Sequence, residues 1–160
     1  MSAIRKLAAG LLLLPVLLLT ACDSTQPTTK ATAQQSFDGT FKTLRTTIAS
    51  GDSLAVKNHQ GRMFVPGTCN ADKAQYTDTS AVYVPKTYDQ QGYLKKLQTK
   101  LNGDGYQTSL GVAGGYDTLT MSKNGYNYQA IATTKVKDTK IDTNKAILFV
   151  GTSPCMDPKA

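Results

Sequence analysis

The chain has 160 residues, of which 40% are hydrophobic, and this is enough for one packed domain with a short additional segment. Its formal net charge is +7, and Arg5 and Lys6 contribute two of these charges, so the part after residue 21 carries +5. Because no run of five like charges occurs, the composition does not indicate a nucleic-acid partner, whereas attraction to an anionic membrane surface or wall polymer is allowed.

The first 21 residues have the parts of an export signal. A basic start is followed by an apolar stretch over residues 7–19 and by the small residues Thr20 and Ala21. The apolar stretch is about 13 residues long, shorter than the ~20 that cross a bilayer, and Pro15 interrupts it. We therefore predict a signal peptide over 1–21 and not a membrane-spanning helix.

The four residues Leu19-Thr20-Ala21-Cys22 resemble the lipobox of bacterial lipoproteins. The resemblance implies that a diacylglycerol is attached to the Cys22 thiol and that the chain is cut between Ala21 and Cys22. It also implies anchoring in the bacterial cell membrane, on the extracytoplasmic face. The alternatives are a secreted soluble protein that is cut elsewhere and an ordinary free cysteine.

Residues 22–32 are predicted to form a lipidated tether. The stretch DSTQPTTKAT, residues 23–32, has no apolar side chain larger than alanine and cannot bury enough surface to fold. Ten flexible residues have a root-mean-square reach of roughly 15 to 20 Å. A single domain over 33–160 is expected to follow.

The domain is expected to begin with a helix. Residues 32–35 have the T-x-x-Q capping-box pattern, and Ser50-Gly51 can end the helix. Its apolar stripe has helical spacing and consists of Phe37, Phe41, Leu44 and Ile48. The polar face carries only Lys42 and Arg45 as cations, which favours packing on a core over an amphipathic membrane helix.

Residues 52–86 give weaker signals. Short runs on either side of 58–61 (NHQG) suggest a hairpin over 53–65, and the small polar residues 66–80 suggest a loop that contains Cys69. Residues 81–84 indicate a strand that stops at Pro85.

A second helix is predicted from residue 87 to residue 103. Thr87 and Gln90 form a capping-box pattern, and Asn102-Gly103 supplies a left-handed exit. The buried stripe is expected to contain Tyr93, Leu94, Leu97 and Leu101.

The last third alternates with the period of a β-strand. Segments 106–112, 116–122 and 126–130 are expected to pair through turns at Gly114-Gly115 and Asn124-Gly125, with Met121 opposite Tyr128. Residues 146–150 are apolar on both faces and predict a covered strand. The expected fold is α+β: an antiparallel meander of about four C-terminal strands, with two amphipathic helices packed on one face.

Two cysteines remain once Cys22 is assigned to the lipid. In an exported chain, Cys69 and Cys155 are expected to form a disulfide. The rival interpretation is a zinc site, which two thiols leave at least two ligands short.

Three short motifs carry a second resemblance: G-D-G-Y at 103–106, K-N-G-Y at 123–126 and T-S-P-C at 152–155. With the lipobox and the order of elements, they look like small uncharacterised lipoproteins of actinobacteria. That resemblance implies no activity.

Catalytic patterns are weak. A nucleophile triad needs an imidazole, and the only histidine, His59, is expected in a turn. A hydrolase with paired carboxylates would need two acids such as Asp104 and Asp117 in one cleft. No spacing typical of calcium, phosphate or zinc binding is found, so we expect neither enzyme activity nor a metal or cofactor.

Binding is the preferred function class. Tyr116, Tyr126 and Tyr128, with Lys123 at the hairpin tip, are candidates for an aromatic binding surface, and the alternative is that the tyrosines only cover the sheet. We interpret the chain as a membrane-anchored extracytoplasmic lipoprotein with a small interaction domain for another envelope protein or a wall polymer. A tethered hydrolase that uses Asp residues and a lipid carrier are the alternatives.

Overall fold

The structure is a computed structural model that describes residues 28–64, 69–70, 72–136 and 140–159. The predicted signal peptide, the lipobox with Cys22, and most of the tether lie outside the described residues. In chain order the elements are α1 (Lys30–Thr46), the 3-10 turn η1 (Ser50–Asp52), β1 (Ala55–Phe64), β2 (Gln75–Val84), α2 (Gln90–Gly103), β3 (Gln107–Ala113), β4 (Tyr116–Lys123), β5 (Tyr126–Thr133) and β6 (Lys145–Thr152).

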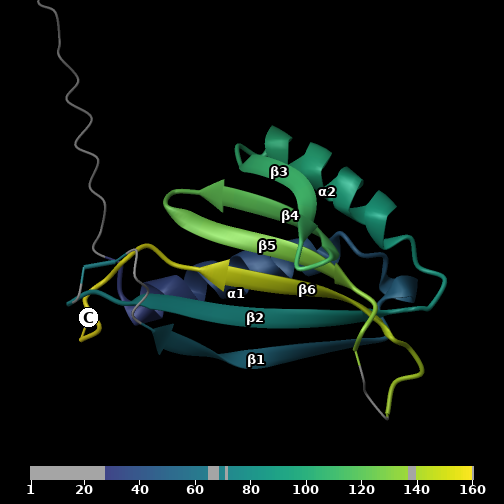
Figure 1. The fold of residues 1–160 in the computed structure, drawn as a ribbon, viewed down its shortest axis with the longest axis horizontal. Coiled ribbons are helices and arrows are strands. Elements are labelled where there is room, and N and C mark those ends of the chain that lie inside the picture. The colour runs from purple at the N-terminus through teal and green to yellow at the C-terminus, as the bar shows by residue number, and fades with distance from the viewer. Residues whose placement is uncertain (1–27, 65–68, 71, 137–139, 160) are drawn as a thin grey trace, which may run out of the picture.

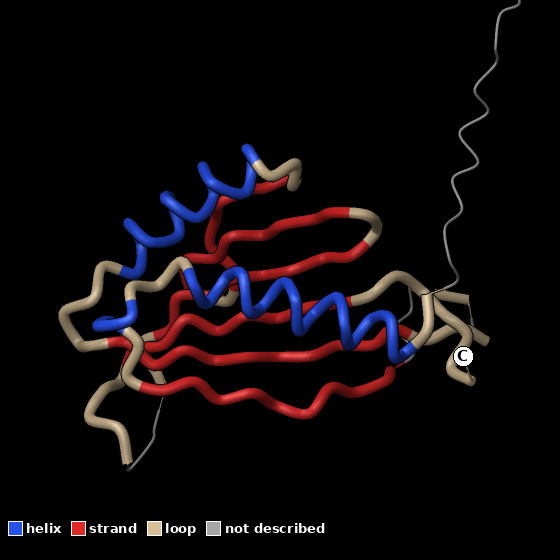
Figure 2. The backbone as a smooth tube through the Cα atoms, turned by 180° about the vertical axis from the view of Figure 1, so that it is seen from behind, coloured by secondary structure: helices blue, strands red, loops and turns tan. Residues whose placement is uncertain are grey.

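The strands form one antiparallel sheet of six, in the order β1-β2-β6-β5-β4-β3. The predicted α+β class and the C-terminal meander are confirmed, but four strands understate the sheet because β1 and β2 extend it beyond β6. Both helices lie on the same side of the sheet, and Figure 2 shows that side. Figure 1 shows the opposite side, which no helix covers.

Helix α1 starts earlier than predicted. Thr29, and not Thr32, is the N-cap: its side-chain oxygen accepts a hydrogen bond from the Thr32 backbone amide at 3.1 Å, and Thr32 Oγ1 accepts one from the Thr29 amide at 2.8 Å. Threonine thus replaces the usual Glu or Gln in the capping box. Residues 30–32, assigned above to the tether, are helical, and the helix ends at Thr46, before the expected Ser50.

The hairpin predicted over 53–65 is wrong. Residues 55–64 form the single edge strand β1, with a register irregularity between His59 and Arg62, and this strand pairs with β2. The loop predicted over 66–80 is wrong from residue 75 onward, because β2 begins there. The strand predicted over 81–84 is confirmed as the last part of β2, which ends at Val84 as expected.

The buried Ser80 side chain in β2 is satisfied by tertiary contacts. Ser80 is fully buried, and its hydroxyl accepts a hydrogen bond from Arg45 at 2.9 Å and donates one to Asn58 at 2.8 Å. Arg45 also donates to Asn58 at 3.0 Å. This network joins α1, β1 and β2, and it lets a polar sequence lie in the interior of the sheet.

Helix α2 begins with Asp89 as its N-cap, not with the predicted Thr87 and Gln90 pair. The Asp89 carboxylate accepts a hydrogen bond from the Gly92 amide at 2.8 Å. The predicted stripe is confirmed, since Tyr93 and the three leucines are all buried. The left-handed residue after the helix is Gly105, with φ of 80°, and not Gly103.

Both predicted hairpin turns are confirmed. Asn124 and Gly125 have φ of 52° and 78°, and Gly114 and Gly115 have φ of 59° and 81°, as a two-residue type I′ turn requires. The predicted register is present, with Met121 opposite Tyr128.

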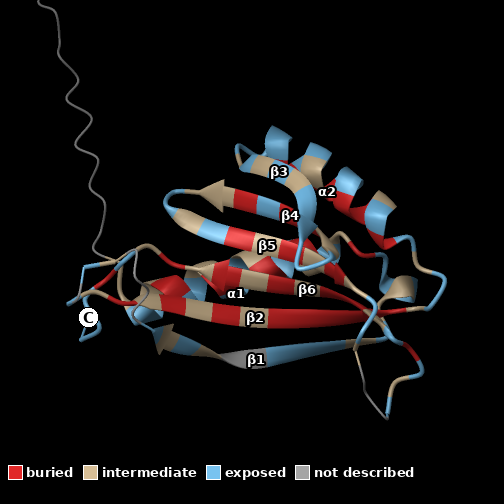
Figure 3. Cartoon of the chain, in the orientation of Figure 1, coloured by how far each residue is buried: buried red, intermediate tan, exposed pale blue. Residues whose placement is uncertain are grey.

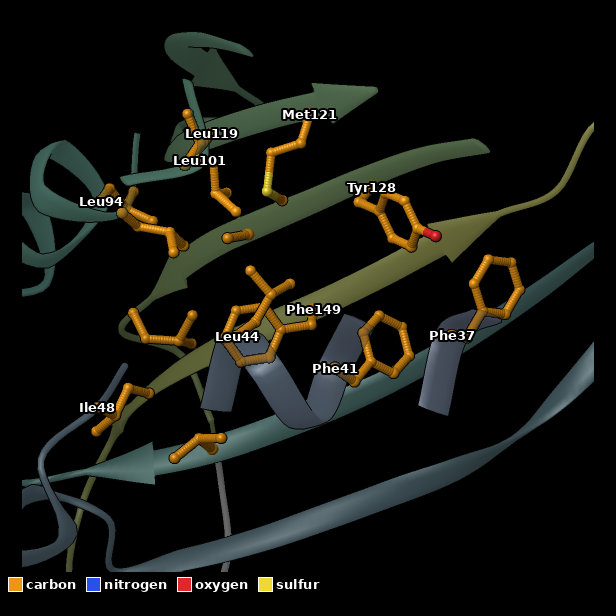
Figure 4. Close-up of a cluster of buried hydrophobic side chains, with 14 of the residues drawn as sticks. Phe37, Phe41, Leu44, Ile48, Leu94, Leu101, Leu119, Met121, Tyr128 and Phe149 are labelled. Carbon is orange, nitrogen blue, oxygen red and sulfur yellow. The ribbon is translucent and has the colours of Figure 1, made fainter. Parts of the chain in front are cut away.

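The core lies between the helices and the sheet, where buried residues concentrate (Figure 3). Figure 4 shows its centre, with Phe37, Phe41 and Leu44 of α1 facing Phe149 of β6 and Tyr128 of β5. The ring of Phe37 lies so close to the sheet that a Cβ on Gly151 would come within 2.7 Å of it.

The C-terminal tail is held to β2 by covalent and hydrogen bonds. The predicted disulfide between Cys69 and Cys155 is present, with the Cα atoms 5.8 Å apart. Ala74 and Met156 form an isolated β-bridge, and the Ser153 hydroxyl accepts a hydrogen bond from the Tyr76 amide at 2.9 Å. Because both cysteines are in this bond, neither thiolate is free for the rival zinc site.

Candidate functional site

The predicted aromatic surface is divided by the fold. Tyr128 is only 3% exposed, and its hydroxyl is bonded to Ser36 at 3.0 Å and Thr40 at 3.3 Å on α1. Burial raises the Tyr128 pKa, which these hydrogen bonds partly oppose. Tyr126 is half-buried, with its ring edge-on to Phe37 at 5.8 Å. These two tyrosines therefore serve the core.

Lys123 and Tyr116 lie at opposite ends of β4. Lys123 Nζ lies 4.8 Å from the ring centre of Tyr106 and donates to the Asp104 carbonyl at 2.7 Å. Tyr116 lies on the other face of the sheet, with Lys135 Nζ 5.7 Å from its ring centre. The four predicted residues thus do not form one binding surface.

The carboxylates considered for hydrolysis are also separated. Asp104 is the C-cap of α2, beside Lys123 at the end of β4, whereas Asp117 is at the start of β4. Six residues of strand span about 20 Å, much farther than the 5–9.5 Å of glycosidase carboxylate pairs. His59 lies in β1, and its side chain is outside the described part of the structure.

A groove of about 660 Å³ lies where the C-terminal end of α1 meets the N-terminal half of α2. The two ends lie side by side in Figure 2 and are joined by the Tyr93 hydroxyl, which donates to the Leu44 carbonyl at 3.1 Å and lies 2.9 Å from Thr47 Oγ1. The groove is lined by Thr47, Ala49, Asp52, Pro85, Thr87, Tyr88, Asp89, Gly92, Tyr93, Lys96, Leu97 and Lys100.

Two tyrosines give this groove an aromatic wall. The rings of Tyr88 and Tyr93 are 6.1 Å apart and tilted by 51°. Burial raises the pKa of Tyr93 far above its ordinary value, and the hydrogen bond to Thr47 opposes this only in part. Burial also raises the pKa of Tyr88, and the charges of Asp52 and Asp89 add to that shift. Both phenols are therefore neutral hydrogen-bonding groups at physiological pH.

Charged groups of both signs surround the aromatic wall. Lys96 and Lys100, one turn apart on the exposed side of α2, contribute cations, and Asp52 contributes a carboxylate from η1. The Asp89 carboxylate is engaged with the Gly92 amide as the helix cap. The groove therefore offers an apolar floor with ionic and hydrogen-bonding groups around it.

A second hollow, of about 640 Å³, shares Thr87, Tyr88 and Asp89 with the groove and continues toward the β3–β4 turn. There Lys145 Nζ donates to the Tyr88 carbonyl at 3.1 Å, which holds the segment before α2 against the start of β6. The two hollows thus form adjacent concave surfaces at one end of the domain.

Metal binding and membrane crossing find no support in the part of the chain that the structure describes. No group of three or more His, Cys, Asp or Glu side chains is arranged to hold a metal ion there. The described helices are all too short or too polar to cross a bilayer.

No family model matches this chain, and searches among curated proteins and solved structures find no significant match.

The sequence analysis missed the groove because its parts come from three separate segments, 47–52, 85–89 and 92–100. One local signal was present: Tyr93, Lys96 and Lys100 follow at helical spacing, so they share one side of α2. Nothing local indicated that Thr47 would pair with Tyr93.

Proposed function

We propose that this protein is a bacterial lipoprotein, anchored through lipid on Cys22 to the extracytoplasmic face of the cell membrane, and that its domain binds a partner in the groove between α1 and α2. The lipobox residues support the anchor. The observation that carries the binding site is its position, because the groove lies at the end of α1 opposite Thr29, where the chain from Cys22 enters the domain.

The distance between the groove and the start of the domain follows from the length of α1. Seventeen helical residues span about 25 Å, so the groove lies about that distance from the start of the domain. Residues 22–28, before the N-cap Thr29, span at most about 25 Å when fully extended. An anchored domain would keep its first residues near the bilayer, and the groove would face away from the membrane.

The groove suits a peptide segment of another envelope protein. Its volume is within the range of about 300–1,000 Å³ of small-ligand sites, which accommodates a few side chains. The wall formed by Tyr88, Tyr93 and Leu97 would take an apolar side chain, while Lys96 and Asp52 would pair with charged or backbone groups beside it.

Two alternative functions find less support in the geometry. A lipid carrier needs an enclosed apolar cavity, whereas the described space between helices and sheet is filled by core side chains (Figure 4). A hydrolase that uses Asp104 and Asp117 would need both carboxylates in one cleft, and they lie at opposite ends of β4.

The test is site-specific photocross-linking in intact cells. A photoreactive residue at Thr87, inside the groove, should give adducts of defined mass, and Ala49→Arg, which fills the groove from an exposed position, should remove them. Ser50→Arg is the matched control, because it adds the same charge at an exposed neighbour outside the groove and should leave the adducts intact.

Digestion of the adducts with protease or with a wall-degrading enzyme distinguishes a peptide partner from a wall polymer. Adducts that persist unchanged in the Ala49→Arg chain would contradict binding in the groove.

A further inference from the structure

The face of the sheet opposite the helices has an unusual distribution of charge. On the five strands β2 to β6, this face carries 21 residues, and none of them is charged. They are Gln75, Thr77, Thr79, Ala81, Tyr83, Gln107, Ser109, Gly111, Ala113, Tyr116, Thr118, Thr120, Ser122, Asn127, Gln129, Ile131, Thr133, Ala146, Leu148, Val150 and Thr152. We call this surface the uncharged face; Figures 1 and 3 view it directly.

All charged residues of these five strands lie on the helix side instead: Asp78, Asp117, Lys123 and Lys145. A one-sided antiparallel sheet ordinarily places its polar and charged residues on the solvent side. The inverse arrangement here removes the main cost of burying the uncharged face, which is the desolvation of ions.

The uncharged face has the anatomy of an interface. Ile131, Leu148 and Val150 lie next to one another across β5 and β6, and Asn127 and Gln129 extend the same row of β5. An apolar centre with a rim of amides and hydroxyls is typical of protein–protein contacts. Lys57 and Arg62, on the neighbouring edge strand β1, lie on the same side of the sheet, opposite Ala81 and Thr77, and so form a charged margin beside β2.

One hydroxyl on this face has no partner. Thr77 Oγ1 is buried and makes no hydrogen bond within the described structure, in a hollow of about 480 Å³ that Arg62, Phe64 and Thr152 also line. Buried hydroxyls in folded proteins nearly always have a hydrogen-bond partner.

We propose that the uncharged face pairs with the same face of a second copy of this chain. A face whose own strands carry no charged residue can stack on itself as two sheets do, about 10 Å apart with their strands nearly aligned. Two cations from neighbouring segments reach this face: Lys57 Nζ lies 5.5 Å from the ring centre of Tyr83, and Lys135 Nζ lies 5.7 Å from that of Tyr116. Both tyrosines lie in the row of Thr133 and Ala146, at the end of the face away from Asn127.

The available area is sufficient for a weak, specific dimer. The connection after β5 covers one end of this face, where Val136 and Ile141 pack against the buried side chains of Ala81, Tyr83 and Ala146. Five strands about 4.8 Å apart, with roughly six free residues each, then offer about 500 Å² per copy, or about 1,000 Å² in total, at the lower limit for specific interfaces. Confinement to a membrane would raise the local concentration and favour pairing.

The proposed anchoring selects one of two possible symmetries. A two-fold axis parallel to the strands brings the tether ends of both copies to the same side of the dimer, as anchoring in one membrane requires. A two-fold axis that runs across the strands would place the two tether ends on opposite sides. With the axis over β5, the middle of the five strands, Asn127 and Gln129 of one copy meet the same residues of the other. The orientation rests on the proposed anchoring, but the pairing itself does not.

Disulfide trapping in membranes tests the pairing. Gln129→Cys and Asn127→Cys, introduced singly in the full chain, should each form a covalent dimer on mild oxidation, because Cys69 and Cys155 are already bonded to each other. Val112→Cys is the matched control: it is 72% exposed on the other face of β3 and should cross-link no more than random collision allows.

A charge variant provides a second, independent measurement. In sedimentation of the detergent-purified chain, Gln129→Lys should lower the dimer fraction by about tenfold or more, because two lysines would face each other. Thr99→Lys, on the exposed side of α2, should leave the dimer unchanged.

Each outcome has a separate meaning. If neither Gln129→Cys nor Asn127→Cys cross-links above the Val112→Cys level, the pairing is wrong. Trapping of Gln129→Cys alone would keep the pairing and overturn the shared orientation. Cross-links only to other proteins would show that a different partner covers the face. Fractionation of the same cells reports anchoring independently, so failure of the lipid anchor and failure of pairing are distinguishable.

Discussion

The junction between the two helices depends on one hydroxyl group, and Tyr93→Phe removes only that group. The Tyr93 side chain is 6% exposed, and its hydroxyl donates to the Leu44 carbonyl and contacts Thr47 Oγ1. Tyr93→Phe should therefore weaken the attachment of α2 to the end of α1 while the aromatic packing stays in place.

The size of the stability loss depends on the hydrogen bonds that the Leu44 carbonyl keeps in the Tyr93→Phe chain. Leu44 also accepts hydrogen bonds from the Thr47 hydroxyl at 2.5 Å and the Thr47 amide at 3.2 Å, so Tyr93→Phe leaves no buried acceptor without a partner. We expect a loss of about 1 kcal/mol in the free energy of unfolding, near the middle of the range for a net hydrogen bond. For a domain of this size that lowers the Tm by about 3 °C.

Thermal and urea unfolding followed by circular dichroism measure this change. Tyr93→Ala should cost about 3–5 kcal/mol, because it also removes the buried ring. Tyr116→Phe is the control, since the Tyr116 hydroxyl makes no hydrogen bond to a described residue, and it should change stability by less than about 0.5 kcal/mol. A Tyr93→Phe chain as stable as wild type, or as unstable as Tyr93→Ala, would refute the assigned role of the hydroxyl.

Three further predictions concern the core, the disulfide and alkaline pH. Gly151→Ala should destabilise the domain by about 1–3 kcal/mol in urea unfolding because the new methyl group meets the Phe37 ring, and Phe37→Leu should recover part of that loss if steric overlap is the cause. The double variant Cys69→Ser, Cys155→Ser should lose about 2–5 kcal/mol by the same measurement, since the bond closes a separation of 86 residues, and a reducing agent should affect only the wild type. Burial raises the pKa of Tyr128 above its unfolded value near 10, so the contribution of the neutral phenol to folding stability is complete below about pH 10 and is lost as the pH rises further. In alkaline titrations, the Tyr128→Phe chain should therefore lose less stability between pH 9 and 12 than wild type. An identical loss in the two chains would argue against burial of the phenol.

Local features of the fold could be predicted because their causes are local. Asn124-Gly125 and Gly114-Gly115 supply the positive φ that type I′ turns need, and each turn fixes the register of the strands beside it. The stripe of α2 has helical periodicity and lies on the core as expected. Cys69 and Cys155 were the only two cysteines left after the lipobox.

Non-local pairing explains the failures. Residues 75–80 are polar and resemble a loop, yet they form a strand between β1 and β6 because Arg45, from α1, and Asn58, from β1, satisfy the buried Ser80 hydroxyl. The turn-like sequence NHQG at 58–61 lies in an edge strand, where a register irregularity accommodates it. The groove escaped prediction for the same reason, since Thr47 and Tyr93 are far apart in the chain and meet only in the folded domain.

The expected aromatic surface failed because hairpin position alone does not determine exposure. Tyr126 and Tyr128 alternate toward the helix side of β5, where α1 supplies Phe37 and two hydroxyl partners. The alternating sequence of the hairpin would be the same whether the side chains of Tyr126 and Tyr128 faced the solvent or the core. The position of α1 decides between the two, and no residue of the hairpin specifies it.

Membrane anchoring through Cys22 is the central claim, and intact-mass spectrometry of the chain purified from bacterial membranes tests it most directly. We predict a mature chain that begins at Cys22 and carries the added mass of a diacylglycerol thioether, and a Cys22→Ala chain that keeps residues 1–21 and carries no lipid. A wild-type chain with a free Cys22 thiol, or normal maturation of the Cys22→Ala chain, would contradict the account.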